Sequence, residues 1–203
     1  MIKPRLVFVP DYENKSVKEY RIQPASWAGG FAASQKQKNI AAIHEMFLKA
    51  SFGKGKKILE VSTKSPDILG TRLSAFNLLK YVPSLDKKVP LECVFQAGKV
   101  FENGGPYLDL LEVKPGEAKK DPRIKNSGRI IAFEFEGKRY PTTPLTYFYD
   151  TLYMEALDEN PEIAGQLLEY DAFTDIEFNP EKSINCQAKT CALYRAMHGR
   201  SAS

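Results

Sequence analysis

The spacing of apolar residues predicts both strands and helices along the chain. Short apolar runs predict strands over residues 5–9 and 58–61, and residues 17–22 are placed to form a hairpin with the first strand. Apolar positions at helical spacing predict a helix over residues 34–50, which Ser34 can cap. Similar patterns predict helices over 114–126, 145–157, 161–168 and 184–197, a hairpin over 129–140 and a loop over 169–177. This mixture predicts an α+β fold, a single domain with several helices around a small mixed sheet.

The segment 91–110, LECVFQAGKVFENGGPYLDL, concentrates polar groups among apolar ones. If residues 90–102 form a helix, Glu92, Gln96 and Lys99 fall at positions i, i+4 and i+7 on one face. Burying such charges is costly unless they are paired or used in chemistry. The pattern therefore has two interpretations, a structural Glu–Lys ion pair or a reactive site.

Two neighbouring segments supply groups that can hold a ligand. Ser74, Phe76 and Asn77 lie in one short stretch and can hold a base or a sugar. The alternative is a loop whose Phe packs inward and whose Ser and Asn bond to the backbone. Gly104 and Gly105 let the backbone approach phosphate oxygens closely, or they simply end the preceding helix.

Composition narrows the class of protein. The 203 residues, 43% of them hydrophobic, are enough to bury the core of one domain. The net charge of +4 is a weak bias toward anionic partners. The three cysteines follow no CxxC spacing, which favours a reduced, cytoplasmic compartment, and the two histidines lie far apart, so no metal site or cofactor is expected. The N-terminus lacks a long apolar run, so neither a signal peptide nor a membrane span is expected.

Several segments together resemble the NADAR superfamily. The run Leu91-Glu-Cys-Val-Phe-Gln-Ala-Gly-Lys99 resembles its helix signature, with Phe-Gln-Ala between a glutamate and a lysine seven residues apart. Residues 73–76 resemble its Ser-Asn-Phe segment, with Ala75 in place of the asparagine, and residues 169–173 with the later Asn185 resemble its C-terminal loop and helix. The run Phe101-Glu-Asn-Gly-Gly-Pro-Tyr107 is most similar to the branch of antitoxins to DarT-type ADP-ribosyltransferase toxins.

This resemblance implies a domain organisation and an activity. Residues 57–197 would form the core, residues 1–56 a branch-specific part and residues 198–203 a frayed tail. Members of that branch are N-glycosidases that remove ADP-ribose from guanine bases in DNA, which undoes the modification made by the toxin. The implied partners are ADP-ribosylated guanine in DNA, ADP-ribose as product and a cognate DarT-type toxin, with no membrane. The alternatives are a glycosidase on free ADP-ribosylated nucleotides or riboflavin-pathway intermediates, and a non-catalytic ADP-ribose-binding module.

The resemblance also suggests roles for particular residues. Breaking a ribosyl–nitrogen bond builds positive charge on the sugar, which the Glu92 carboxylate can stabilise while Asp171 or Asp175 serves as second acid or base. Lys99 can act as an ammonium that pairs with an anion or hydroxyl, or as a neutral Schiff-base nucleophile. The further contacts to substrate are expected from Ser74, Asn77 and Gln96 for ribose, Gly104 and Gly105 for diphosphate, Phe76, Tyr107 and Phe173 for base stacking, Asn185 in the C-terminal segment, and Lys119, Lys120 and Arg123 for a DNA backbone.

Overall fold

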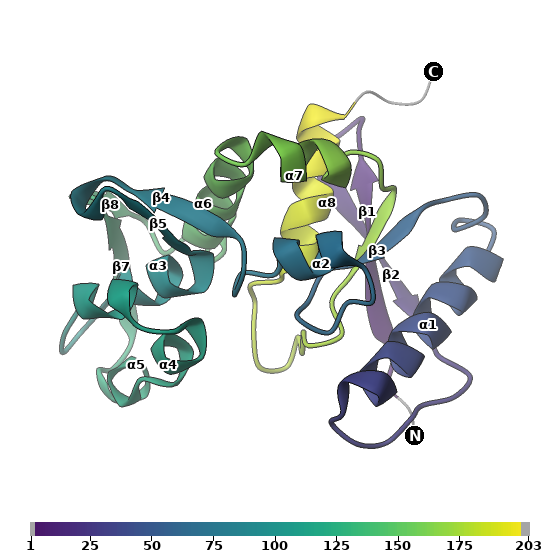
Figure 1. The fold of residues 1–203 in the computed structure, drawn as a ribbon, viewed down its shortest axis with the longest axis horizontal. Helices are drawn as coiled ribbons and strands as arrows, with labels where there is room; N and C mark the ends of the chain where they lie inside the picture. The colour runs from purple at the N-terminus through teal and green to yellow at the C-terminus, as the bar shows by residue number, and fades with distance from the viewer. Residues whose placement is uncertain (1–2, 200–203) are drawn as a thin grey trace. The chain divides into compact units, whose positions relative to one another are not determined.

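A computed structural model describes residues 3–199 of the chain (Figure 1). The chain forms two compact units. The terminal unit comprises Met1–Ser74 and Glu162–Ser203, and the inserted unit comprises Ala75–Pro161. Both units combine helices with small sheets, which confirms the predicted α+β class. The predicted boundaries at residues 56 and 197, within one NADAR-like domain, stay a prediction.

The terminal unit contains a four-stranded sheet. Its strands are β1 (Arg5–Asp11), β2 (Ser16–Ile22), β3 (Ile58–Glu60) and β9 (Ala172–Thr174), in the order β2-β1-β9-β3. The antiparallel β1–β2 hairpin and β3 confirm the strands predicted for the first 61 residues. β9 was expected to lie within a loop, and that prediction is wrong because it pairs antiparallel with β1 and parallel with β3. Its three residues are all buried, so tertiary pairing overrides the polar flanks of the segment.

The terminal unit also contains helices. They are α1 (Ala33–Lys49), α2 (Ile68–Leu73), α8 (Gln187–His198) and α7 (Pro161–Leu167), whose first residue belongs to the inserted unit. On α1, Ile40, Ile43 and Phe47 belong to a buried cluster with Val7 and Val9 of β1. Helix α8 packs against β1, β2 and β9 (Figure 1). The apolar periodicity read from the sequence therefore marks the face of α1 that the core covers.

The start of α1 differs from the prediction. The helix begins at Ala33, so Ser34 lies inside its first turn rather than at the cap. The Gln35 side chain instead provides a partner for a backbone N–H at the start of the helix, since its Oε1 accepts a hydrogen bond from Ala32 N–H at 3.1 Å. Ser34 lies two positions after the N-cap residue, Ala32, so its side chain cannot accept from the second or third helical amide as a cap does.

A buried polar cluster lies at the ends of β3 and β9. Glu60 accepts hydrogen bonds from Thr174 Oγ1 at 2.6 Å and from Ile176 N–H at 2.7 Å. His44 of α1 lies 2.8 Å from the same hydroxyl through its Nε2. Burial raises the pKa of the Glu60 carboxyl, and burial lowers the pKa of His44 to about 4. The cluster therefore favours neutral side chains, which is the usual outcome when ionisable groups lose water.

The inserted unit contains a hairpin, a three-stranded sheet and several short helices. The predicted hairpin over 129–140 is confirmed, and the predicted helix over 114–126 is broken because Pro122 has no N–H with which to continue it. The elements are β4 (Leu79–Val82), η1 (Pro83–Leu85), β5 (Lys87–Pro90), α3 (Leu91–Ala97), β6 (Lys99–Phe101), η2 (Leu108–Glu112), α4 (Pro115–Lys120), α5 (Pro122–Asn126), β7 (Ile130–Phe135), β8 (Lys138–Tyr140) and α6 (Tyr147–Asp158).

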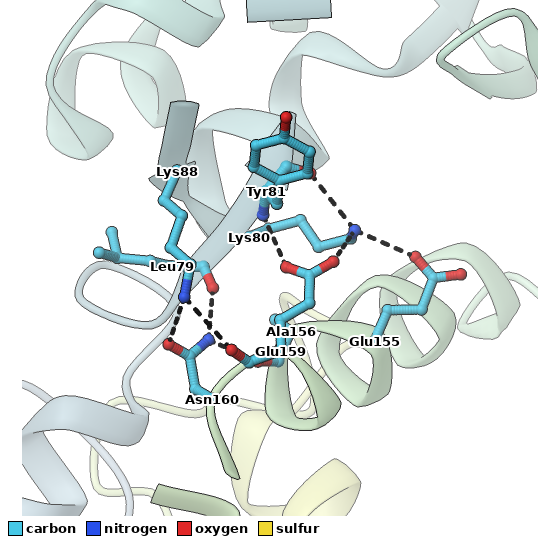
Figure 2. A network of polar contacts seen from close by, with 8 residues as sticks. All are labelled: Leu79, Lys80, Tyr81, Lys88, Glu155, Ala156, Glu159 and Asn160. Carbon is cyan, nitrogen blue, oxygen red and sulfur yellow. Dashed lines mark hydrogen bonds and ion pairs between the residues drawn. The ribbon is translucent and has the colours of Figure 1, made fainter. Parts of the chain in front are cut away.

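Ion pairs and hydrogen bonds join the β4–β5 hairpin to α6 (Figure 2). Lys80, only 5% exposed, contacts the carboxylates of Glu159 and, at 3.4 Å, Glu155. Glu159 also accepts from Tyr81 N–H at 2.7 Å, and Asn160 donates to the Leu79 carbonyl at 2.9 Å. A buried ammonium needs such partners, because an uncompensated charge costs several kcal/mol (roughly 3–5). The network holds the hairpin that leads directly into α3.

Candidate functional site

Helix α3 is shorter than the sequence suggested. It starts after Pro90, as expected, but ends at Ala97 rather than continuing to residue 102. Gly98 caps it, and the Gly98 carbonyl accepts from Glu134 N–H of β7 at 2.7 Å. A side chain at position 98 would place a Cβ 2.7 Å from the Glu134 carbonyl, so only glycine permits this approach. The chain leaves the helix at this point, and Lys99 begins β6, which pairs with β7.

Glu92, Gln96 and Lys99 nevertheless form one continuous polar chain. Gln96 Nε2 donates to Glu92 Oε1 at 2.9 Å, and Lys99 Nζ donates to Gln96 Oε1 at 2.7 Å. Glu92 and Gln96 are 6% and 5% exposed, so the chain is largely shielded from water. The predicted grouping is therefore present, although Lys99 reaches it from β6 rather than from a helical face.

Burial changes the acid–base character of Lys99. Its Nζ lies 4.7 Å from the centre of the Phe95 ring, over an apolar surface. Loss of water lowers the pKa of Lys99 to about 8, with the Glu92 carboxylate raising it and the Lys119 ammonium lowering it further. A substantial fraction of the amine is neutral slightly above neutral pH. The two roles considered for Lys99, ammonium and nucleophile, both match this environment.

Lys119 of α4 contacts both the Glu92 carboxylate and the Phe76 ring. Its Nζ lies 4.0 Å from Glu92 Oε1 and 5.3 Å from the centre of the Phe76 ring. Asn77, next to Phe76, is exposed. The sequence indicated Lys119 only as a backbone-binding residue. Its contact with Glu92 depends on the packing of α4 against α3, which no local pattern signals.

The glycine loop lies against the backbone of Lys99. Gly105 has φ +85°, and a Cβ at this position would lie 2.3 Å from the Lys99 carbonyl. Gly104 has φ +155°, and a Cβ there would meet the Tyr107 hydroxyl. Both predicted glycines therefore serve close approach and a conformation that other residues disfavour. The loop continues to Tyr107, whose N–H donates to the Ala97 carbonyl at 2.9 Å.

Tyr107 is held on several sides. Its hydroxyl is hydrogen-bonded to Ser127 Oγ, and the Arg123 guanidinium lies 4.5 Å from its ring centre. Arg123 also forms ion pairs with Asp109 at 2.6 Å and Asp121 at 2.9 Å. These contacts show that Arg123 holds the loop, and its predicted role along a DNA backbone stays a prediction. One face of the Tyr107 ring is therefore occupied by Arg123.

The other predicted site residues belong to the terminal unit. Ser74 is buried and caps the C-terminus of α2. Asp171 accepts from Lys57 N–H at 2.9 Å, and Asp175 accepts from Glu177 N–H at 2.9 Å. Each of these carboxylates thus has a backbone contact that shapes its own segment. Their participation in one site with Glu92 stays a prediction.

Phe173 and Asn185 differ in what they offer a ligand. Phe173 is fully buried on β9, so its environment favours packing over base stacking. Asn185 Oδ1 is buried without a hydrogen-bond partner, a property it shares within residues 3–199 with Arg5 Nε only. A buried polar atom without a partner is costly and needs an explanation, for which a bound ligand is one candidate.

No helix in the part that the structure describes, residues 3–199, is long and apolar enough to cross a membrane.

A comparison with curated proteins found no match. The sequence model of a family described as DarT1-associated NADAR antitoxin matches residues 3–202. The match extends the resemblance through the N-terminal part and associates the family with a DarT toxin. Because it covers essentially the whole chain, the protein belongs to the family of DarT1-associated NADAR antitoxins.

Proposed function

We propose that this antitoxin is an N-glycosidase that hydrolyses the bond between ADP-ribose and guanine in DNA. The observation that carries the proposal is the chain from Glu92 through Gln96 to Lys99. It joins a shielded carboxylate to an amine whose pKa is lowered to about 8. Family membership supports the antitoxin role, since removal of the modification would reverse the action of the toxin.

In the proposed reaction the bond between ribose C1′ and the guanine nitrogen breaks. The electron pair leaves with guanine, which takes up a proton. A water oxygen adds to C1′ and keeps one of its protons, and the other proton of that water passes to a general base of the protein. The Glu92 carboxylate stabilises the positive charge that develops on the sugar, and Gln96 holds that carboxylate in place. Asp171 and Asp175 are the candidates for the second acid or base.

Lys99 enters this reaction in one of two ways. As an ammonium it pairs with a substrate oxygen and balances the charge of Glu92. As a neutral amine it attacks C1′, the bond from C1′ to the guanine nitrogen breaks, and guanine leaves with the electron pair and takes up the proton that the amine loses. The ribose ring opens to a Schiff base with Lys99, which water hydrolyses to release ADP-ribose and restore the amine. Its lowered pKa makes the second route accessible close to neutral pH.

An exposed basic surface favours DNA over a free nucleotide as the substrate. Lys114, Lys120 and Lys125 lie on or beside α4 and α5 with exposed side chains, and none of them is within 4 Å of a carboxylate in the described residues. Exposed lysines next to a site neutralise phosphates and release counterions, so the affinity of a DNA substrate would fall as salt rises. A small nucleotide would show little such dependence.

Turnover on a short DNA oligonucleotide that carries ADP-ribosyl guanine tests the proposal. We expect the wild type to release ADP-ribose and unmodified DNA, and Glu92→Gln and Lys99→Ala to lose roughly 100-fold or more of this activity while still binding the oligonucleotide. Glu112→Gln, which changes an exposed carboxylate of the same unit, is the matched control.

The remaining outcomes identify the alternatives. Tight binding of ADP-ribose without release of product by the wild type would favour a non-catalytic binding module. Activity on free ADP-ribosyl nucleotides alone, insensitive to salt, would favour a metabolite glycosidase. Activity that survives Glu92→Gln would keep the function and reject the carboxylate.

A further inference from the structure

Lys119 occupies an unusual position at the edge of the polar chain. Its side chain is 58% exposed, whereas that of Glu92, its ion-pair partner, is 7% exposed. At 4.0 Å the contact between Lys119 Nζ and Glu92 Oε1 is at the long limit for an ion pair. Within residues 3–199 Lys119 has no other carboxylate within 4 Å. An exposed ammonium therefore contacts a shielded carboxylate.

The charges around Glu92 do not balance. One carboxylate, Glu92, faces two amines, Lys99 and Lys119. Lys99 retains most of its positive charge at neutral pH, because its pKa is about 8. The cluster therefore has an excess of positive charge, and like charges so close together are unfavourable unless an anion joins them. A substrate phosphate would supply that anion.

Lys119 also contacts the Phe76 ring. The ammonium lies 5.3 Å from the ring centre, within the range of a cation–π contact. Lysine binds phosphate as a compact charge on a flexible stem, so a small movement suffices to exchange one oxygen partner for another. Moving to a phosphate would also free Glu92 to face the positive charge of the sugar.

We propose that Lys119 is the residue that recognises the phosphate nearest to the scissile ribose and so selects ADP-ribosyl over ribosyl substrates. This inference rests on the proposed function for the identity of the substrate. Lys119 exchanges its contact with Glu92 for one with the phosphate. It is a specificity-determining residue, distinct in role from the exposed lysines of the α4–α5 surface, because it alone contacts the carboxylate.

Binding of ADP-ribose and of phosphate-free ribose to the full-length protein tests this inference without requiring turnover. We expect Lys119→Ala to weaken ADP-ribose binding about tenfold and to leave ribose binding unchanged, and Lys119→Arg to retain most of the affinity. The matched control is Lys87→Ala, another exposed lysine with a single carboxylate partner, Glu112 at 3.4 Å. The Lys87 variant should bind ADP-ribose as the wild type does.

Steady-state kinetics on the ADP-ribosyl oligonucleotide provide the second readout. The KM of Lys119→Ala should rise about tenfold with kcat changed less than threefold, because the contact contributes to binding rather than to bond cleavage. Equal ADP-ribose affinity in Lys119→Ala and Lys87→Ala would overturn the inference and leave the proposed function intact. If the wild type shows no turnover, and Lys119→Ala binds ADP-ribose more weakly than the wild type does, the proposed function fails while phosphate recognition by Lys119 stands. Equal losses of ADP-ribose and ribose binding would show a structural role and overturn the inference.

Discussion

Lys99 shows how a single side chain acquires its chemistry from burial. Its amine loses water over the Phe95 ring and keeps one hydrogen bond, to Gln96. Desolvation disfavours the charged form more strongly than the Glu92 carboxylate restores it, so the pKa falls to about 8. Two nearby charges then tune the amine in opposite directions, Glu92 upward and Lys119 downward.

Direct titration of Lys99 checks this environment. We expect its NMR signal, in protein with ¹³C-methylated lysines, to titrate with a midpoint near pH 8, below the ordinary lysine value. Glu92→Gln should lower the midpoint, because it removes the anion that stabilises the ammonium, and Lys119→Ala should raise it, because it removes a competing cation. A Lys99 signal that titrates near pH 10.5 would contradict the buried position of the amine.

The loop between β6 and η2 shows what an element requires of its residues. Gly105 combines a φ of +85° with the approach of the Lys99 carbonyl, which lies 2.3 Å from where a Cβ would be. Gly116, in the first turn of α4, has open space around the corresponding position. The two glycines therefore differ in what they contribute, although the sequence presents them alike.

Alanine at each position should give opposite results. Gly105→Ala should lower the free energy of unfolding by about 1–3 kcal/mol, because it introduces both strain and a steric clash. Gly116→Ala should leave it unchanged or raise it by up to about 1 kcal/mol, because alanine loses less backbone entropy on folding. Urea unfolding followed by circular dichroism measures both, and equal effects of the two substitutions would show that the loop is not constrained by Lys99.

At the scale of the whole molecule, the buried cluster of the terminal unit links stability to pH. His44 titrates with a pKa of about 4 in the folded protein, below its unperturbed 6.5, because burial disfavours the imidazolium. The folded state thus resists protonation that the unfolded chain accepts. The stabilisation is fully present above pH 6.5 and is lost as the pH falls toward 4.

The free energy of unfolding should therefore decrease by about 3 kcal/mol between pH 7 and pH 4 through His44 alone. The raised pKa of Glu60 acts in the opposite direction, because its neutral form is favoured in the folded state as the pH falls. His44→Gln should accordingly flatten the acid limb of a plot of urea midpoint against pH. An acid limb that stays as steep in His44→Gln as in the wild type would assign the acid sensitivity to other groups.

Local patterns were sufficient for elements whose partners are close in sequence. The β1–β2 hairpin and the β7–β8 hairpin form as predicted, because each pairs two neighbouring strands. Helix α6 buries Phe148 and Tyr153, as an aromatic stripe at helical spacing indicates. The bond from Gln96 to Glu92 also follows from positions four residues apart on one helix.

Contacts between distant segments decided the rest. β9 is a strand only because β1 and β3 flank it, and α3 ends at Ala97 only because β7 pairs with the chain that follows. The approach of Lys119 to Glu92 depends likewise on the packing of α4 against α3. The sequence by itself thus determined the α+β class, the local elements and the candidate carboxylate and amine, because helical and strand periodicity act over a few residues. Only the tertiary structure decided where each helix or strand ends and which charged side chains contact each other. The hydrogen bonds and ion pairs responsible join segments that lie far apart along the chain.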